Sequence, residues 1–212
     1  MTTPYRLRTS TPATAVALAL MILTAVACGG DKKAPTIAAP EGFQVASNDK
    51  EGFALAVPSD WTVIPLAVNP ADFDADANRL RRENPKLASI LNQARKLGQS
   101  EGKFMAVAPD GVANVNLTAD EPDQKTLAEV VAASRAALTD FGGTNFAEEP
   151  ATLAGQPATK LAFRLPVQTD DGVIPTDEIQ YYMLKGKKAY ILTVAAAPAD
   201  VASTIAGSLA LR

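Results

Sequence analysis

Alternation of apolar and polar residues predicts several β-strands, with turn signals between them. Leu161, Phe163 and Leu165 alternate with charged residues, which is typical of a strand that has one buried face. Residues 109–111, a Pro-Asp-Gly sequence, and Gly186 each predict the turn of a hairpin. The expected strands are residues 53–57, 61–64, 103–108, 113–118, 160–165, 178–184 and 189–195.

Three segments place apolar residues at helical spacing. Asn84 followed by Pro85 predicts a helix start, because asparagine caps helices and proline suits the first helical position. Thr126 and Glu129 match a capping box, and Pro198 opens a short last helix. The expected buried faces are Leu87, Ile90, Leu91, Ala94 and Leu97; Leu127, Val130, Val131, Leu138 and Phe141; and Val201, Ile205 and Leu209.

This order of hairpins and helices indicates an α+β fold, in which helices flank an antiparallel β-sheet. Residues 42–212 are enough for one domain with its own core. On the late hairpin, Tyr182 and Leu184 share one face while Tyr181 and Met183 share the other, and both pairs are apolar. We therefore expect either that helices cover both faces or that one face is an exposed binding patch.

Residues 1–27 have the features of a secretory signal peptide. Arg6 and Arg8 lie near the N-terminus, and the uncharged run 13–27 ends in small residues directly before Cys28. Fifteen helical residues reach about 22 Å, which is less than a hydrocarbon core of about 30 Å. A signal peptide is therefore favoured over a membrane-spanning helix.

Cys28 is the only cysteine of the chain, and it follows the apolar run directly. Small residues that end at a cysteine resemble the lipobox of bacterial lipoproteins, with Ala25 where that motif usually has leucine. The resemblance implies a diacylglyceryl group on Cys28 and N-acylation after cleavage, which would anchor the protein to the membrane. Residues 28–41 are then a flexible tether. The alternative is ordinary secretion, with cleavage after Ala27.

The composition narrows the chemistry that this chain can perform. Its 212 residues include 20 basic and 23 acidic side chains, and a net charge of −3 argues against a nucleic-acid partner. Histidine, the commonest general base and metal ligand, is absent from the sequence. A G-x-S-x-G nucleophile motif is absent as well. We therefore expect no catalytic residue, no cofactor and no metal ion.

One acidic segment resembles a calcium-binding loop. Asp72, Asp74, Asp76 and Glu83 occupy positions 1, 3, 5 and 12 of that template, but Ala77 replaces the glycine that its sharp turn requires. Because acidic residues favour the positive end of a helix dipole, the start of a helix is the better interpretation.

Two parts of the sequence resemble PsbP-like domains. Residues 52–61 read GFALAVPSDW and resemble the opening of such domains, and 180–184 with 188–194 resemble their late hairpin. Together with the lipobox, this combination is similar to actinobacterial LpqN-type lipoproteins. The resemblance implies an antiparallel sheet flanked by helices and an accessory or binding role, and it transfers no catalytic residue.

These observations predict a lipid-anchored protein on the extracytoplasmic side of the cell membrane that is not an enzyme. We expect it to act as a binding or accessory module for another envelope protein or an envelope lipid. A secreted hydrolase that uses carboxylates or a Ser–Lys pair is the alternative. Tyr181 and Tyr190 could join an aromatic groove or simply pack in the core. The candidate binding face consists of Trp61, Tyr182 and Leu184.

Overall fold

The computed structural model describes residues 33–212, apart from 65, 67–69, 99–101 and 170–171. The predicted signal peptide and Cys28 therefore lie outside the described residues. Residues 33–40 contain no helix or strand, and the first strand begins at Phe43. Within the described chain, no helix is long and apolar enough to cross a membrane.

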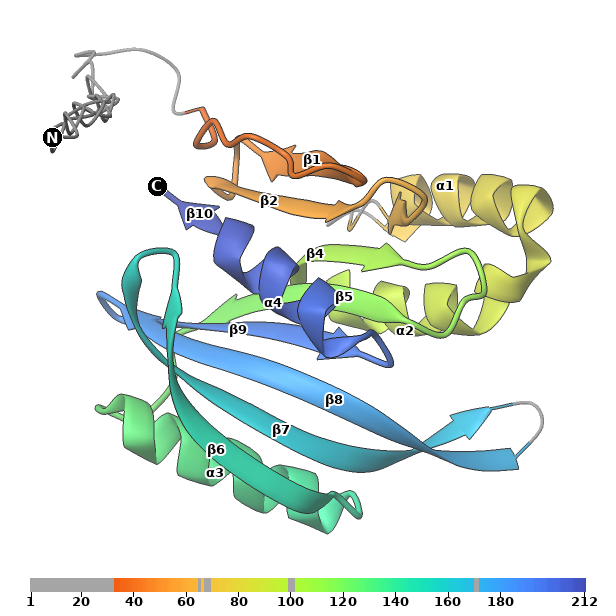
Figure 1. Cartoon of the computed structure of the whole chain (residues 1–212). Helices are drawn as coiled ribbons and strands as arrows, with labels where there is room; N and C mark the ends of the chain where they lie inside the picture. Colours follow the sequence, from red (N-terminus) through yellow and green to blue (C-terminus); the bar gives the residue numbers. More distant parts are fainter. Residues whose placement is uncertain (1–32, 65, 67–69, 99–101, 170–171) are drawn as a thin grey trace, which may run out of the picture. The chain divides into compact units, whose positions relative to one another are not determined.

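The described elements alternate between strand pairs and helices along the chain (Figure 1). In order they are β1 (Phe43–Asn48), β2 (Phe53–Pro58), β3 (Thr62–Ile64), α1 (Pro70–Glu83), the 3-10 turn η1 (Pro85–Leu87), α2 (Ala88–Gly98), β4 (Gly102–Val107), β5 (Asn114–Asp120), α3 (Leu127–Asp140), β6 (Thr144–Leu153), β7 (Gln156–Thr169), β8 (Gly172–Lys185), β9 (Lys188–Ala195), α4 (Ala199–Ser208) and β10 (Ala210–Leu211).

The strands form two antiparallel sheets. The larger sheet has seven strands in the order β3-β4-β5-β9-β8-β7-β6, and the smaller has the order β1-β2-β10. Both expected hairpins are present, as the pairs β4–β5 and β8–β9. The prediction of an α+β fold with an antiparallel sheet flanked by helices is confirmed.

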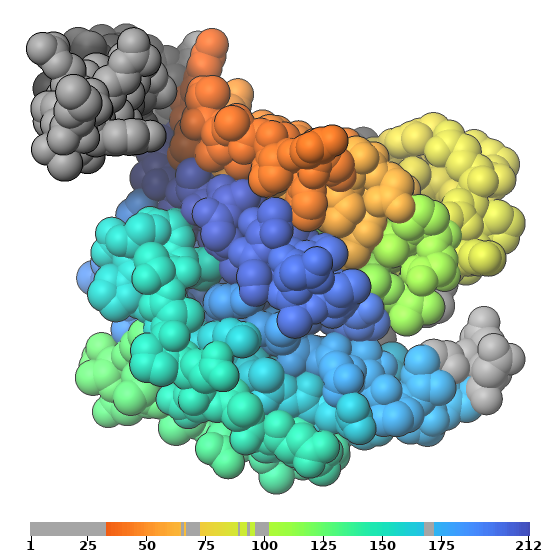
Figure 2. All heavy atoms as spheres, viewed as in Figure 1, coloured from red at the N-terminus to blue at the C-terminus, as the bar shows by residue number. Residues whose placement is uncertain are grey.

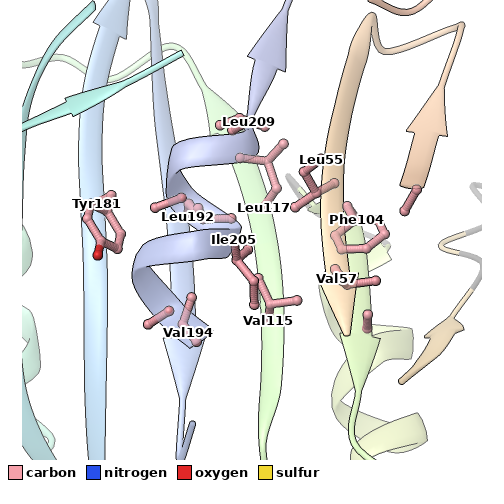
Figure 3. Close-up of a cluster of buried hydrophobic side chains, with 14 of the residues drawn as sticks. Leu55, Val57, Phe104, Val115, Leu117, Tyr181, Leu192, Val194, Ile205 and Leu209 are labelled. Atoms are coloured by element: carbon pink, nitrogen blue, oxygen red, sulfur yellow. The ribbon is translucent and has the colours of Figure 1, made fainter. Parts of the chain in front are cut away.

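One face of the seven-stranded sheet carries the main hydrophobic core. Ile205 of α4 and Leu209, which directly follows this helix, point toward Leu117 of β5 and Leu192 of β9, and Leu55 of β2 closes the same cluster (Figure 3). In the space-filling view, α4 lies between the β1–β2 strands and β6 on this side of the domain (Figure 2). The smaller sheet and α4 together therefore cover this face.

The other face is covered only near its two ends. Helices α1 and α2 pack on β3 and β4 through a cluster that includes Leu91 and Met105. Helix α3 packs on β7 and β8, where Val130 and Val131 contact a cluster that includes Tyr182. Because these clusters are separate, the middle of this face has no helix over it.

Several elements differ from the sequence expectation. Strands β1, β6 and β10 were not predicted, because they are short or largely exposed and need no strict alternation. The helix expected from Asn84 to Gly98 is present, but it starts as the 3-10 turn η1, which Asn84 caps by accepting from the Lys86 N–H, and becomes α-helical only at Ala88. A separate helix, α1, precedes it and begins at Pro70. Phe141 was predicted to be buried and is 74% exposed, because α3 ends one residue earlier.

Candidate functional site: a polar-floored groove

A groove of about 420 Å³ lies on the open part of the sheet, between the two helical clusters. Strands β5, β9 and β8 provide its floor. Ile90 of α2 and Val112 of the β4–β5 turn lie on one side, and Leu138 of α3 and Leu165 of β7 lie on the other. Helices α2 and α3 therefore define the position of the groove, because they flank the part of the sheet that no helix covers.

Strand register explains why the floor is polar. Directly opposed residues in an antiparallel sheet point to the same face. One row across β4, β5, β9, β8 and β7 contains Met105, Asn116, Thr193, Gln180 and Leu161. The two end residues belong to the clusters under α2 and α3, while the three central residues line the groove. On the α4 face, a parallel row is apolar throughout: Ala106, Val115, Val194, Ile179 and Ala162.

The buried polar residues of the domain gather in this groove. Within the described chain, the only polar residues that are at most 9% exposed are Asn114, Thr176 and Thr193, and all three line it. The structure gives the Thr176 and Thr193 hydroxyls no hydrogen-bond partner among the described residues, although no fully enclosed side-chain polar atom is unpaired there. These hydroxyls therefore open onto the groove and can serve a ligand.

Glu178 lies in the middle of the groove floor. Its row neighbours are Phe163 on β7, Ala195 on β9 and, beyond it, Asn114 on β5. Burial disfavours the charged form and raises the pKa of the Glu178 carboxyl to about 7. A carboxyl group in this environment exchanges its proton near neutral pH.

Tyr182 lies beneath α3, at the edge of the groove. Its side chain is fully buried, and this burial raises the pKa of its phenol to about 12. A hydrogen bond with Ser134 of α3 acts in the opposite direction and lowers this pKa, but its effect is smaller. The hydroxyl donates to Oε1 of Gln180, one of the floor residues. This bond holds the Gln180 amide in place and leaves its NH2 group available to a ligand.

The expected aromatic residues do not gather around one cavity. Trp61 and Tyr181 are buried in the core under α4, whereas Tyr182 and the partly buried Leu184 pack against α3. Helices therefore cover both faces of the late hairpin, which is the first of the two expected arrangements. None of these residues lines the groove. Nothing in the structure tests Trp61, Tyr182 and Leu184 as a binding face, which stays a prediction.

The groove residues themselves were missed, although the sequence carries a signal for them. Asn114, Asn116 and Thr118 alternate with apolar residues along one strand, and Thr193 interrupts an apolar run on its neighbour. Thr176, Glu178 and Gln180 occupy every second position of a third strand, although Asp177 between the first two is also polar. Polar faces of three separate strands become one site only when the strand order is known.

The acidic segment that resembles a calcium loop is helical, as expected. It lies within α1, where Arg79 pairs with Asp76 and Glu83, and Arg95 pairs with Asp74. Among the described residues, no three potential metal ligands come together. The carboxylates are therefore engaged by arginines on the helix surface.

Comparison with known proteins identifies the fold. No family model matches the chain, and no curated protein matches it by sequence. The solution structure of cyanobacterial PsbP (CyanoP) from Synechocystis sp. PCC 6803 superimposes with a TM-score of 0.52 at 15% identity, covering 88% of this chain and 98% of that chain. The domain has the PsbP-like fold. The PsbP-like architecture expected from residues 52–61 and the late hairpin is therefore confirmed.

A mycobacterial protein was also found among solved structures. LpqN, described as involved in cell envelope biogenesis of Mycobacterium tuberculosis, gives a TM-score of 0.43 at 13% identity and covers 83% of this chain and 89% of its own. A likeness at this level of identity concerns the fold and does not extend to a ligand.

Proposed function

We propose that this chain is a cell-envelope accessory protein that binds a ligand in the groove, held at the membrane by a lipid on Cys28. The observation that carries the binding role is the row of polar floor residues where the sheet has no helix over it. A face that served packing alone would be apolar or fully solvated, as the α4 face and the exposed strand β6 illustrate. The signal-peptide features and Cys28 in the sequence support the envelope location.

The groove chemistry favours binding over the hydrolase alternative. A Ser–Lys mechanism needs a nucleophile beside a base, and carboxylate hydrolysis needs two acidic groups near one another. The described residues that line the groove include no serine, no lysine and a single carboxylate, Glu178. Their amides and hydroxyls are groups that orient a ligand by hydrogen bonding.

Filling the groove tests this proposal. Thr193→Trp introduces a bulky ring at the centre of the floor, and Thr152→Trp makes the same change at an exposed position of β6. We expect native mass spectrometry of the protein purified from envelopes to detect a bound small molecule in the wild type and the control, and none in Thr193→Trp.

A milder variant covers the case in which Thr193→Trp does not fold. Asn116→Leu keeps the branched shape and the number of side-chain heavy atoms of asparagine while it removes the polar floor group, so the groove loses hydrogen bonding with much less filling than in Thr193→Trp. Equal occupancy of wild type, Thr193→Trp and Asn116→Leu would contradict the groove as the binding site.

A further inference from the structure

The charge of the groove restricts its ligand. Among the described residues that line it, Glu178 is the only one that carries a charge, and neither lysine nor arginine is present. A phosphate or carboxylate ligand would therefore meet a carboxyl group with no cation to balance it. The site favours a ligand group of positive charge.

Glu178 also has no counter-ion among the described residues. The structure gives its carboxyl no hydrogen bond or ion pair with any other described residue. Its neighbours on β7, β9 and β5 are uncharged, and the nearest titratable group on its own strand and face is the Tyr182 phenol. The adjacent Asp177 points to the other face, where it pairs with Arg164 at 2.8 Å beside a separate hollow of about 390 Å³. An ammonium group supplied by a ligand would complete the site.

The walls of the groove are apolar, so they favour a ligand that has an apolar part. Val112 and Ile174 are 49% and 39% exposed, although they line the groove. With Ile90, Leu138 and Leu165 they present aliphatic surface above the polar floor. Burying such surface under a ligand contributes about 25 cal/mol per Å². A ligand with an apolar part beside its cationic group matches both features.

We propose that the groove binds a small organic ammonium compound, with its cationic nitrogen at the Glu178 carboxylate and its apolar part against the aliphatic walls. This inference rests on the proposed function and names the ligand class of the same site. The polar floor residues Gln180, Thr193 and Asn116 would then receive further hydrogen-bonding groups of the ligand.

Binding of such a cation depends on pH. Burial raises the pKa of Glu178 to about 7, so a part of the protein carries a neutral carboxyl at that pH. A bound ammonium stabilises the carboxylate and displaces the proton. Affinity is therefore expected to rise by about tenfold in total between about pH 6 and about pH 8, because the charged fraction of the carboxyl rises from about one tenth to about nine tenths.

Three isosteric probes test the inference on the full-length chain in lipid nanodiscs. Hexylammonium, hexanol and hexanoate each contain six carbon atoms in a linear chain and differ in charge. In NMR titrations at about pH 8, we expect the wild type to bind hexylammonium about tenfold or more tightly than the other two. Glu178→Gln should bring hexylammonium to within about twofold of hexanol and remove the pH dependence, while Glu148→Gln on the exposed strand β6 should change neither.

The outcomes separate this inference from the proposed function. Hexylammonium binding that Thr193→Trp abolishes and Glu178→Gln leaves unchanged would overturn the ammonium assignment and keep the groove as a binding site. Binding that survives Thr193→Trp would overturn both. A lysine-containing peptide that binds where hexylammonium does not would replace the small compound with a partner protein.

Discussion

At the scale of single residues, Glu178 is the side chain that departs furthest from its ordinary behaviour. A carboxyl group on a partly buried sheet face, without a cation, is less stable when charged than it is in water. Such a group lowers the stability of the domain. Carboxyl groups with a shifted pKa are common at binding and catalytic sites, where they have a chemical role.

The pH dependence of folding should report this property of Glu178. In the unfolded chain the carboxyl has its ordinary pKa of 4.5, and in the folded domain the pKa is about 7. Between these values the folded state binds more protons, so the free energy of unfolding should fall as pH rises and then stay constant above about pH 7. Glu178→Gln should be roughly 1–3 kcal/mol more stable than the wild type at about pH 8 and nearly equal to it at about pH 4.

Chemical denaturation of both proteins across this pH range measures the difference. Glu148→Gln is the matched control, because it makes the same change on exposed β6. Parallel pH profiles for wild type and Glu178→Gln would show that burial does not hold this carboxyl neutral.

Tyr182 shows what sequence reasoning can and cannot resolve at this scale. The alternation of Tyr181 and Tyr182 correctly assigned them to opposite faces of the late hairpin. The strand sequence does not show which part of the sheet face is left uncovered, because this depends on where α2 and α3 pack on the sheet. The groove residues therefore escaped notice even though the strands that carry them were predicted.

At the scale of elements, the groove depends on how the α1–α2 unit rests against the β4–β5 turn. The Nδ2 group of Asn84 donates to the backbone oxygen of Pro109 at 2.9 Å. Gly111 in the same turn adopts φ +78°, and a Cβ placed there would lie 2.6 Å from the backbone oxygen of Lys86 in η1. This close approach sets the distance between α2 and the floor of the groove.

Gly111→Ala should therefore be more harmful than an ordinary turn substitution. It combines a left-handed backbone conformation with a contact to rigid backbone, and we expect a loss of about 2–4 kcal/mol in the free energy of unfolding. Gly155→Ala is the control, because Gly155 has φ +73° and nothing within 4 Å of its Cβ position. It should cost about 1 kcal/mol.

Denaturant titrations of the two variants give the comparison. Equal losses for Gly111→Ala and Gly155→Ala would mean that the turn moves away from η1 without cost. In that case the α2 wall of the groove is adjustable.

Helix boundaries illustrate the limits of prediction for elements. The capping box at Thr126 and Glu129 located α3 correctly, because both reciprocal hydrogen bonds form. The Asn84-Pro85 signal was equally clear, yet it marks a 3-10 turn between two helices. Helix α1 has mostly polar residues on its surface and buries Phe73, Ala77 and Leu80 only because it packs on η1 and α2, in the cluster that residues of β3 and β4 complete. Tertiary packing of this kind leaves little trace in local sequence.

At the scale of the whole molecule, the proposed attachment to the membrane depends on one sulfur atom, that of Cys28. If Cys28 carries the lipid, Cys28→Ala should release the protein from membranes or leave it unprocessed, because two or more acyl chains supply the anchor. Membrane fractionation and the mass of the mature protein measure this outcome. Cys28→Ala protein that stays in the membrane fraction at its mature mass would show that something other than this lipid holds it. Thr152→Trp, which leaves Cys28 intact, should fractionate with the wild type.

The strand order of the larger sheet also governs when the domain can form. Strand β9 lies between β5 and β8, so it joins the β3-β4-β5 part of the sheet to the β6-β7-β8 meander. Thr118 donates to the backbone oxygen of Ile191 across the β5–β9 pair, and 73 residues separate them in the chain. Non-local pairing of this kind slows folding, because a long loop must close before its contacts stabilise anything. In the proposed export through a narrow pore, β5 lacks its second neighbour, β9, until the last quarter of the chain has emerged. On that proposal, the topology delays completion of the larger sheet until nearly all of the chain has crossed the membrane.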